Sequence, residues 1–190
     1  RCTVSNCYFS GFAGSGARGI VISVNYQLII GNTFKGFGAG TAVWGGGRGN
    51  IVGNYFISCS TAVLASTYEL VSGNKFESCS SAVTGNGDYV TVTGNSFLSG
   101  SCNTGQYGGW TITGNVFADG KVVIGDSGAN IGCSVTGNYF WTSSFGVDVT
   151  DGDGTVVSGN TFNSISTACV RVLVAAKYTV IIGNNFVNEP

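Results

Sequence analysis

Four aspartates are the residues whose type and spacing most suggest chemistry: Asp126, Asp148, Asp151 and Asp153. They fall in two successive units of a repeat, in or beside the turns that end each unit. Glycoside hydrolysis uses paired carboxylates, one protonated as the acid and one ionised as base or nucleophile. A cluster of carboxylates also raises the pKa of one member, so that one can stay protonated as the acid while another is ionised. We therefore predict these four as catalytic candidates. Two alternatives stay open: ordinary turn residues in a "DGDG" context, and a site for calcium or another cation.

The chain contains no histidine, and this excludes several classes of catalytic and metal-binding site. Ser-His-Asp and Cys-His triads and His-based zinc sites are excluded, so any catalysis must use carboxylates, Lys, Tyr or Cys. Charged residues make up 9% of the 190 residues and the net charge is −1, which argues against nucleic-acid and anionic-membrane partners. No apolar run reaches the roughly 18 residues of a membrane span, and no signal-like N-terminus is present.

A short motif, an aliphatic residue followed by x-Gly-Asn-x-Phe, recurs along the whole chain. Its asparagines are Asn32, Asn54, Asn74, Asn95, Asn115, Asn138, Asn160 and Asn184. We align a degenerate first copy, "VSNCYF", on Asn6, with Ser5 in place of the glycine, which gives spacings of 20 to 26 residues. Self-similarity at this period predicts a solenoid, in which each unit buries its apolar face against its neighbours.

The apolar residues of the repeat alternate as they do in β-strands. The residue three before each Asn is aliphatic and the residue two after it is Phe, as in Val71 and Phe76 around Asn74. A second apolar stretch such as "TAVW" or "TAVL" follows about eight residues later. Short strands of this kind can coil so that each coil pairs with the next at about 4.8 Å.

These strings resemble the repeats of the pectin-lyase-like superfamily, which includes pectate lyases, polygalacturonases, alginate epimerases and many phage tailspikes. The resemblance implies an all-β fold, a right-handed single-stranded parallel β-helix of about nine coils. We expect residues 1–190 to form one such domain, cut from a longer chain or capped by assembly. The resemblance also implies a polysaccharide partner and an extracellular, secreted or virion-surface location. The family's catalytic motifs do not transfer: the Gly-His-Gly of polygalacturonases is missing, and Arg171 and Lys177 stand in no matching lyase motif.

Within such a coil the Gly-Asn pair has a structural explanation. Glycine tolerates the positive φ of a tight bend, and the Asn amide can bond to the Asn of the next coil in a ladder. Cys59 and Cys79 occupy the same repeat position in adjacent coils. They fit either an inward column of small residues, which we favour, or a disulfide between coils.

Aromatic residues suggest a sugar-binding surface. Tyr55 and Tyr139 each follow a ladder Asn and should face outward, and we expect Trp44, Trp110, Trp141 and Tyr107 to be exposed too. Flat aromatic faces suit sugar rings. The predicted substrate-binding residues are Trp44, Tyr55, Trp110, Tyr139, Trp141 and Arg171.

The residues two and four before each Asn should form two outward rows that are rich in Thr and Ser in the central coils, such as Thr91 and Thr93. Such a face suits packing against another chain, as in a homotrimer, or against a covering loop. Threonine arrays of this kind also resemble those of ice-binding solenoids. The leading hypothesis is a module that recognises a polysaccharide, and cleavage at the four aspartates stays open as an extension of it. The alternative is a structural or adhesive rod, with ice binding third.

Overall fold

The computed structural model describes residues 2–11, 14, 16–23, 25–125 and 130–188, and every strand in it belongs to a parallel ladder. Sheet A holds β1 (Thr3–Ser5), β4 (Leu28–Ile30), β7 (Asn50–Val52), β10 (Leu70–Ser72), β13 (Thr91–Thr93), β16 (Thr111–Thr113), β20 (Ser134–Thr136), β24 (Val156–Ser158) and β27 (Val180–Ile182). Sheet B holds β2 (Tyr8–Ser10), β5 (Thr33–Lys35), β8 (Tyr55–Ile57), β11 (Lys75–Glu77), β14 (Ser96–Phe97), β17 (Val116–Phe117), β21 (Tyr139–Trp141), β25 (Thr161–Asn163) and β28 (Asn185–Val187). Sheet C holds β3 (Arg18–Val21), β6 (Thr41–Trp44), β9 (Thr61–Ala65), β12 (Ser81–Gly85), β15 (Ser101–Asn103), β18 (Val122–Ile124), β22 (Phe145–Val149) and β26 (Ala168–Val172). A small fourth sheet pairs β19 (Asn130–Ile131) with β23 (Gly152–Asp153).

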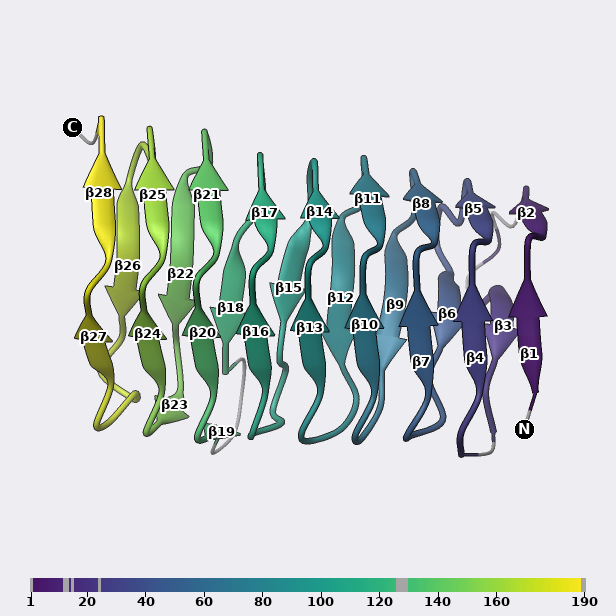
Figure 1. Ribbon diagram of the computed structural model, residues 1–190, viewed down its shortest axis with the longest axis horizontal. Helices are drawn as coiled ribbons and strands as arrows, with labels where there is room; N and C mark the ends of the chain where they lie inside the picture. Colours follow the sequence, from purple (N-terminus) through teal and green to yellow (C-terminus); the bar gives the residue numbers. More distant parts are fainter. Residues whose placement is uncertain (1, 12–13, 15, 24, 126–129, 189–190) are drawn as a thin grey trace.

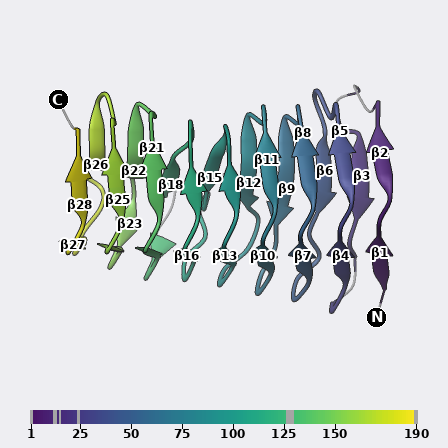
Figure 2. The ribbon, with the colours of Figure 1, turned by 45° about the horizontal axis from the view of Figure 1, so that its top comes forward.

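The coils stack side by side into a rod, with the two chain ends at its opposite ends (Figure 1). In Figure 1 the strands of sheets A and B run upward in front and those of sheet C run downward behind, while the chain advances from right to left; Figure 2 shows the same order from a tilted view. The winding is therefore right-handed, as predicted. In the described part of the chain sheets A and B have nine strands each and sheet C has eight, close to the nine coils expected.

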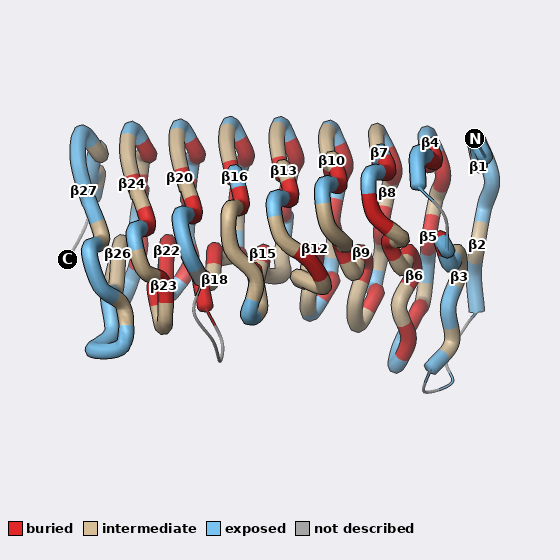
Figure 3. The backbone as a smooth tube through the Cα atoms, turned by 90° about the horizontal axis from the view of Figure 1, so that it is seen from below, coloured by how far each residue is buried: buried red, intermediate tan, exposed pale blue. Residues whose placement is uncertain are grey.

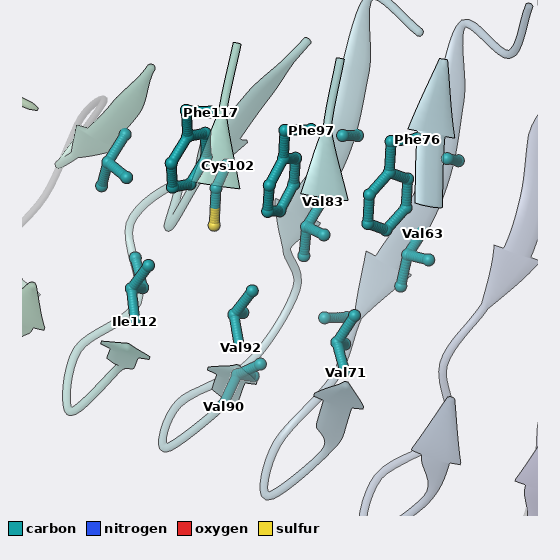
Figure 4. Close-up of a cluster of buried hydrophobic side chains, with 14 of the residues drawn as sticks. Val63, Val71, Phe76, Val83, Val90, Val92, Phe97, Cys102, Ile112 and Phe117 are labelled. Atoms are coloured by element: carbon teal, nitrogen blue, oxygen red, sulfur yellow. The ribbon is translucent and has the colours of Figure 1, made fainter. Parts of the chain in front are cut away.

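Apolar side chains of all three sheets fill the interior. In sheets A and B every second residue of a strand points inward, and in sheet C two neighbouring residues such as Ala82 and Val83 are buried. Val71, Phe76 and Val83 of consecutive sheets therefore meet in the centre, as Figure 4 shows. The Phe rings stack from Phe9 to Phe186 with centroids 4.3–5.5 Å apart and interplanar angles of 5–17°. The predicted strand alternation is confirmed.

The predicted asparagine ladder runs between sheets A and B. The backbone N–H and the Nδ2 of Asn54 donate to Oδ1 of Asn74 at 2.9 and 3.1 Å. The same Nδ2 also donates to the carbonyl oxygens of Ile29 and Val52. Equivalent bonds join each ladder Asn to the next, up to Asn184.

The alignment of the first repeat on Asn6 is wrong by one residue. Strand register pairs Val4 with Ile29 and Tyr8 with Thr33, so Cys7 takes the ladder position. The Cys7 N–H accordingly donates to Oδ1 of Asn32 at 2.9 Å. Asn6 instead takes the glycine position with φ of 53°, a region that Asn tolerates better than most residues.

Cys59 and Cys79 are free, buried thiols in an inward column, so the disulfide alternative is wrong for this structure. The two predicted outward rows lie on sheet A, where strand register pairs Thr91 with Thr111 and Thr93 with Thr113. Among the described residues no helix is long and apolar enough to cross a membrane.

Candidate functional site

A hollow opens where sheet B turns into sheet C, over four consecutive coils. Its volume is about 240 Å³. Backbone and small side chains of the turns form most of its wall, together with one acid, one base and one aromatic ring. The residues that line it are Ser80, Gly100, Ser101, Asp119, Gly120, Lys121, Ser143, Ser144 and Phe145.

A cluster of charges adjoins the hollow on sheet C. Nε of Arg171 donates to Oδ1 of Asp148 at 2.8 Å, and Nη2 of Arg171 donates to Oδ2 of Asp148. Nζ of Lys121 lies 3.8 Å from Oδ2 of Asp148. Both cations also lie over the Phe145 ring, at 4.3 Å for Arg171 and 5.5 Å for Lys121. Asp148 thus holds two cations at the rim, and its hydrogen bond raises the pKa of Arg171.

The local sequence "FGVDV" explains this placement. Val147 and Val149 point into the core and Asp148 between them points outward, as predicted, but it is buried beneath its cationic partners. Strand register sets Asp148 directly beside Arg171 of the next coil. Gly146 is needed because a Cβ there would lie 2.3 Å from the Phe162 ring.

Two predicted aromatics stand on the sheet B side of the same coil. Trp141 is 49% exposed, and Tyr139 is exposed beside it on the outward face of β21. Nδ2 of Asn163 donates to the Tyr139 hydroxyl at 3.0 Å, which fixes that ring. Together with the hollow and the Lys121–Asp148–Arg171 cluster, these aromatics form what we call the β21–β22 corner.

The other predicted carboxylates bond elsewhere. Asp153 accepts the backbone N–H of Lys177 through Oδ1 at 3.0 Å, and the backbone of Asp151 lies against Gly125 and Ile124. Asp126 lies outside the described residues. Among the residues the structure describes, no group of three or more Cys, Asp or Glu side chains is placed to hold a metal ion.

Three of the predicted sugar-binding residues lie away from the corner. Trp44 on β6 has the Arg18 guanidinium 3.6 Å from its ring centroid, and Tyr55 on β8 bonds to Glu77. Tyr55 is four strands from Tyr139 in sheet B, or roughly 19 Å at the spacing of adjacent strands. The expected exposure of Trp110 is wrong: its side chain is 0% exposed and Nε1 donates to the Gly87 carbonyl at 2.9 Å.

Sequence reasoning missed three residues of the corner: Asp119, Lys121 and Phe145. They stand in the turns between sheets B and C, where the repeat is least regular. The available signal was the string "ADGKVV", which places an acid and a base directly before a buried strand.

The fold has clear counterparts among solved structures. A tailspike mutant of E. coli bacteriophage HK620, in complex with a pentasaccharide, superposes with a TM-score of 0.69 at 14% identity, over 99% of this chain and 45% of that chain. A second mutant of that tailspike, also with the pentasaccharide, gives 0.68 at 15% identity over 91% and 41%. This chain has the parallel β-helix fold of phage tailspikes.

A further tailspike mutant of the same phage matches with a TM-score of 0.64 at 15% identity. The chain spans less than half the length of these tailspikes. No family model matches the chain, and no curated protein does. At such identities the likeness establishes the fold alone.

Proposed function

We propose that the chain is a polysaccharide-recognising β-helix, borne on a virion or otherwise extracellular, and that the β21–β22 corner is its binding surface. The observation that carries this is the hollow of about 240 Å³, which is lined by Lys121 and by Ser143, two residues after the exposed Trp141, and lies next to the Asp148–Arg171 ion pair. Its support from relatives is the fold shared with tailspikes that were solved with a pentasaccharide.

Each part of the corner has a use in sugar recognition. The Trp141 face offers an apolar platform for the C–H face of a pyranose ring. Ser143 and Ser144 offer hydroxyls, and Lys121 and Arg171 offer N–H donors to ring hydroxyls or acidic substituents. Because Asp148 holds the Arg171 guanidinium by two hydrogen bonds before a ligand arrives, that side chain loses little freedom on binding.

Recognition fits this geometry better than cleavage. Hydrolysis of a glycosidic bond needs two carboxylates on opposite sides of that bond. At the corner, both oxygens of Asp148 already face cations, and the second carboxylate is the exposed Asp119. Cleavage by the predicted aspartates stays a prediction. It would be contradicted if Asp148→Asn and Asp151→Asn left the release of reducing ends from a bound glycan unchanged.

The binding proposal is tested with a glycan array, followed by titration calorimetry on the best ligand. Trp141→Ala should weaken glycan binding by about tenfold. A ring that stacks on an aromatic side chain contributes on the order of 1–3 kcal/mol to binding, and the variant loses this contact. Lys121→Gln should weaken it by a smaller factor.

Two control variants match these changes at a distance from the corner. Tyr8→Ala removes an exposed aromatic from β2 in the same sheet, and Lys35→Gln removes an exposed lysine from β5. If the corner variants and their controls lost glycan affinity equally, the assignment of the binding surface to the corner would be contradicted.

The alternative of an adhesive rod rests on the in-register outward rows of sheet A. Light scattering that shows a strict monomer at high concentration would count against it. Ice binding by the same rows predicts thermal hysteresis, and its absence would remove that hypothesis.

A further inference from the structure

Each turn that leads into sheet A contains a left-handed residue six positions before the ladder Asn, with φ between 51° and 70°. A bulky residue is strained in this conformation, whereas glycine adopts it freely. Three coils have glycine at this position, and the other five carry a large side chain at the cost of that strain. The eight residues are Tyr26, Arg48, Tyr68, Tyr89, Gly109, Gly132, Gly154 and Tyr178.

Two of these residues, Tyr68 and Tyr89, stack on the outside of the rod. Their ring centroids lie 5.1 Å apart and the ring planes differ by 10°. The N–H of Tyr68 donates to the carbonyl oxygen of Asp88 at 3.0 Å, which aligns the two turns in adjacent coils. The two tyrosines are 52% and 56% exposed. The strained turns therefore hold two phenols face to face where solvent reaches both.

The groups on either side of this pair are not phenols. The Arg48 guanidinium lies 5.4 Å from the Tyr68 ring centroid and separates that ring from Tyr26, whose hydroxyl accepts Nη1 of Arg48 at 3.0 Å. In the coil after Tyr89 stands Gly109, where a Cβ would lie 2.4 Å from the Tyr89 ring. In the part of the chain that the structure describes, Tyr68 and Tyr89 are the one pair of tyrosines whose rings stack.

Two phenols in contact can be coupled by one-electron oxidation. An oxidant such as a peroxidase with hydrogen peroxide takes one electron and one proton from each hydroxyl. The two phenoxyl radicals join through a new bond between ring carbons ortho to the hydroxyls, and the ortho hydrogens leave as protons while the oxygens regain theirs. Two hydrogen atoms are lost in all, and they reduce one hydrogen peroxide to two waters. Exposed side chains rotate fast enough to bring the ortho carbons of stacked rings together.

We propose that Tyr68 and Tyr89 are a site of oxidative modification, where a one-electron oxidant joins the two rings into a dityrosine cross-link between coils. The fold holds the two phenols next to each other, so coupling within the chain is favoured over coupling between chains. The site is formed by turns before sheet A and does not depend on glycan binding at the β21–β22 corner.

The cross-link should also stabilise the rod. It joins residues 68 and 89 covalently, and such a bond restricts the unfolded chain as a disulfide does. The cross-linked protein should therefore unfold several degrees above the untreated protein.

The test treats the chain with a haem peroxidase and hydrogen peroxide. Cys2 and Cys7 are exposed thiols that would reduce phenoxyl radicals, so they are first alkylated with N-ethylmaleimide. The monomer should gain dityrosine fluorescence and lose the mass of two hydrogen atoms, with a yield independent of protein concentration. Trypsin should then release residues 49–75 linked to residues 76–121, and fragmentation should place the link on Tyr68 and Tyr89.

Tyr68→Phe and Tyr89→Phe are the decisive variants, because phenylalanine keeps the stacked ring and lacks the hydroxyl that is oxidised. Each should lower the yield of dityrosine within the chain at least about tenfold. Tyr8→Phe and Tyr178→Phe are the matched controls and should keep the yield. Both remove an exposed phenol, and Tyr178 occupies the same left-handed turn position as Tyr68 and Tyr89.

Three outcomes would overturn the proposal. The first is no dityrosine in the wild-type chain under conditions that couple N-acetyltyrosinamide. The second is dityrosine that forms only between chains. The third is an unchanged yield within the chain for Tyr68→Phe and Tyr89→Phe.

Discussion

At the scale of the residue, one side chain type explains the most conserved feature of the internal repeat. Each interior ladder Asn receives two hydrogen bonds on Oδ1 from the coil before it and donates Nδ2 to the coil on its other side and to backbone carbonyls. No other side chain offers this donor and acceptor pair at this length. Aspartate has no donor and glutamine is one methylene longer.

Replacing Asn95 with alanine should therefore be costly. The change leaves the buried backbone N–H of Asn74 without its acceptor, and it removes the Nδ2 donor from the Val71 carbonyl and from Oδ1 of Asn115. At on the order of 1–3 kcal/mol for each buried unpaired group, we expect a loss of about 3 kcal/mol in the free energy of unfolding. Chemical denaturation followed by circular dichroism measures it. Ser96→Ala, one residue along and facing outward, should change stability by less than about 0.5 kcal/mol, and an equal loss there would contradict the ladder explanation.

The sequence allowed the ladder, the Phe stack and the outward rows to be predicted because each recurs at fixed spacing. It did not allow the inward row five before each Asn to be predicted. That row contains Gln27, Gly49, Glu69, Val90 and Trp110 in successive coils, without a shared chemical type. Each of these side chains is adapted to its own neighbours, so no repeat reveals that Trp110 is buried or that Gln27 is unpaired.

At the scale of the element, the glycine-rich turn "GGGRG" is shaped by one buried acid from the next coil. The Glu69 carboxylate is 1% exposed and accepts N–H groups from Gly46, Gly47 and Ser66. A Cβ on Gly45 would lie 2.1 Å from its Oε2, so a larger residue would displace it. The turn that presents Arg48 and the turn that presents Tyr68 are thus held by the same carboxylate.

Stability should consequently depend on pH through Glu69. Burial raises its pKa to about 7 from 4.5, against the effect of its three backbone hydrogen bonds. Between these values the native state keeps a proton that the unfolded chain loses, so the free energy of unfolding falls as pH rises. The contribution is complete below pH 4.5 and lost through pH 7, by up to about 3 kcal/mol.

Denaturation curves from pH 4.5 to 8 measure this slope. Glu69→Gln should remove most of it, whatever its effect on stability at a single pH. Glu77→Gln is the control: Glu77 lies on the surface of sheet B, where a hydrogen bond from Tyr55 lowers its pKa, so the variant should keep the slope. A wild-type chain whose stability does not change over this range would contradict the assignment to Glu69.

At the scale of the whole molecule, contacts reach only from one coil to the next, so position along the rod decides how much a side chain matters. Figure 3 shows the inner surfaces of the central coils buried and the two end coils largely exposed. The Phe two residues after the ladder Asn is therefore buried to very different extents in different coils. Phe117 is fully buried between Phe97 and Phe140, with ring centroids 4.3 and 4.8 Å away, whereas Phe186 in the last coil is 52% exposed.

Truncating these two rings should give very different results. Phe117→Ala removes a ring packed on both faces, which costs about 3–5 kcal/mol and weakens the coupling between the two halves of the rod. Phe186→Ala removes a ring that stacks on Phe162 and is otherwise half in solvent, so it should cost about 1 kcal/mol. The denaturant midpoints of the two variants, measured by circular dichroism, test this prediction. Both variants make the same Phe→Ala change in sheet B, so they differ only in their position along the rod. Equal losses would mean that the chain is stabilised as one cooperative core and not as a sum of coils and their interfaces.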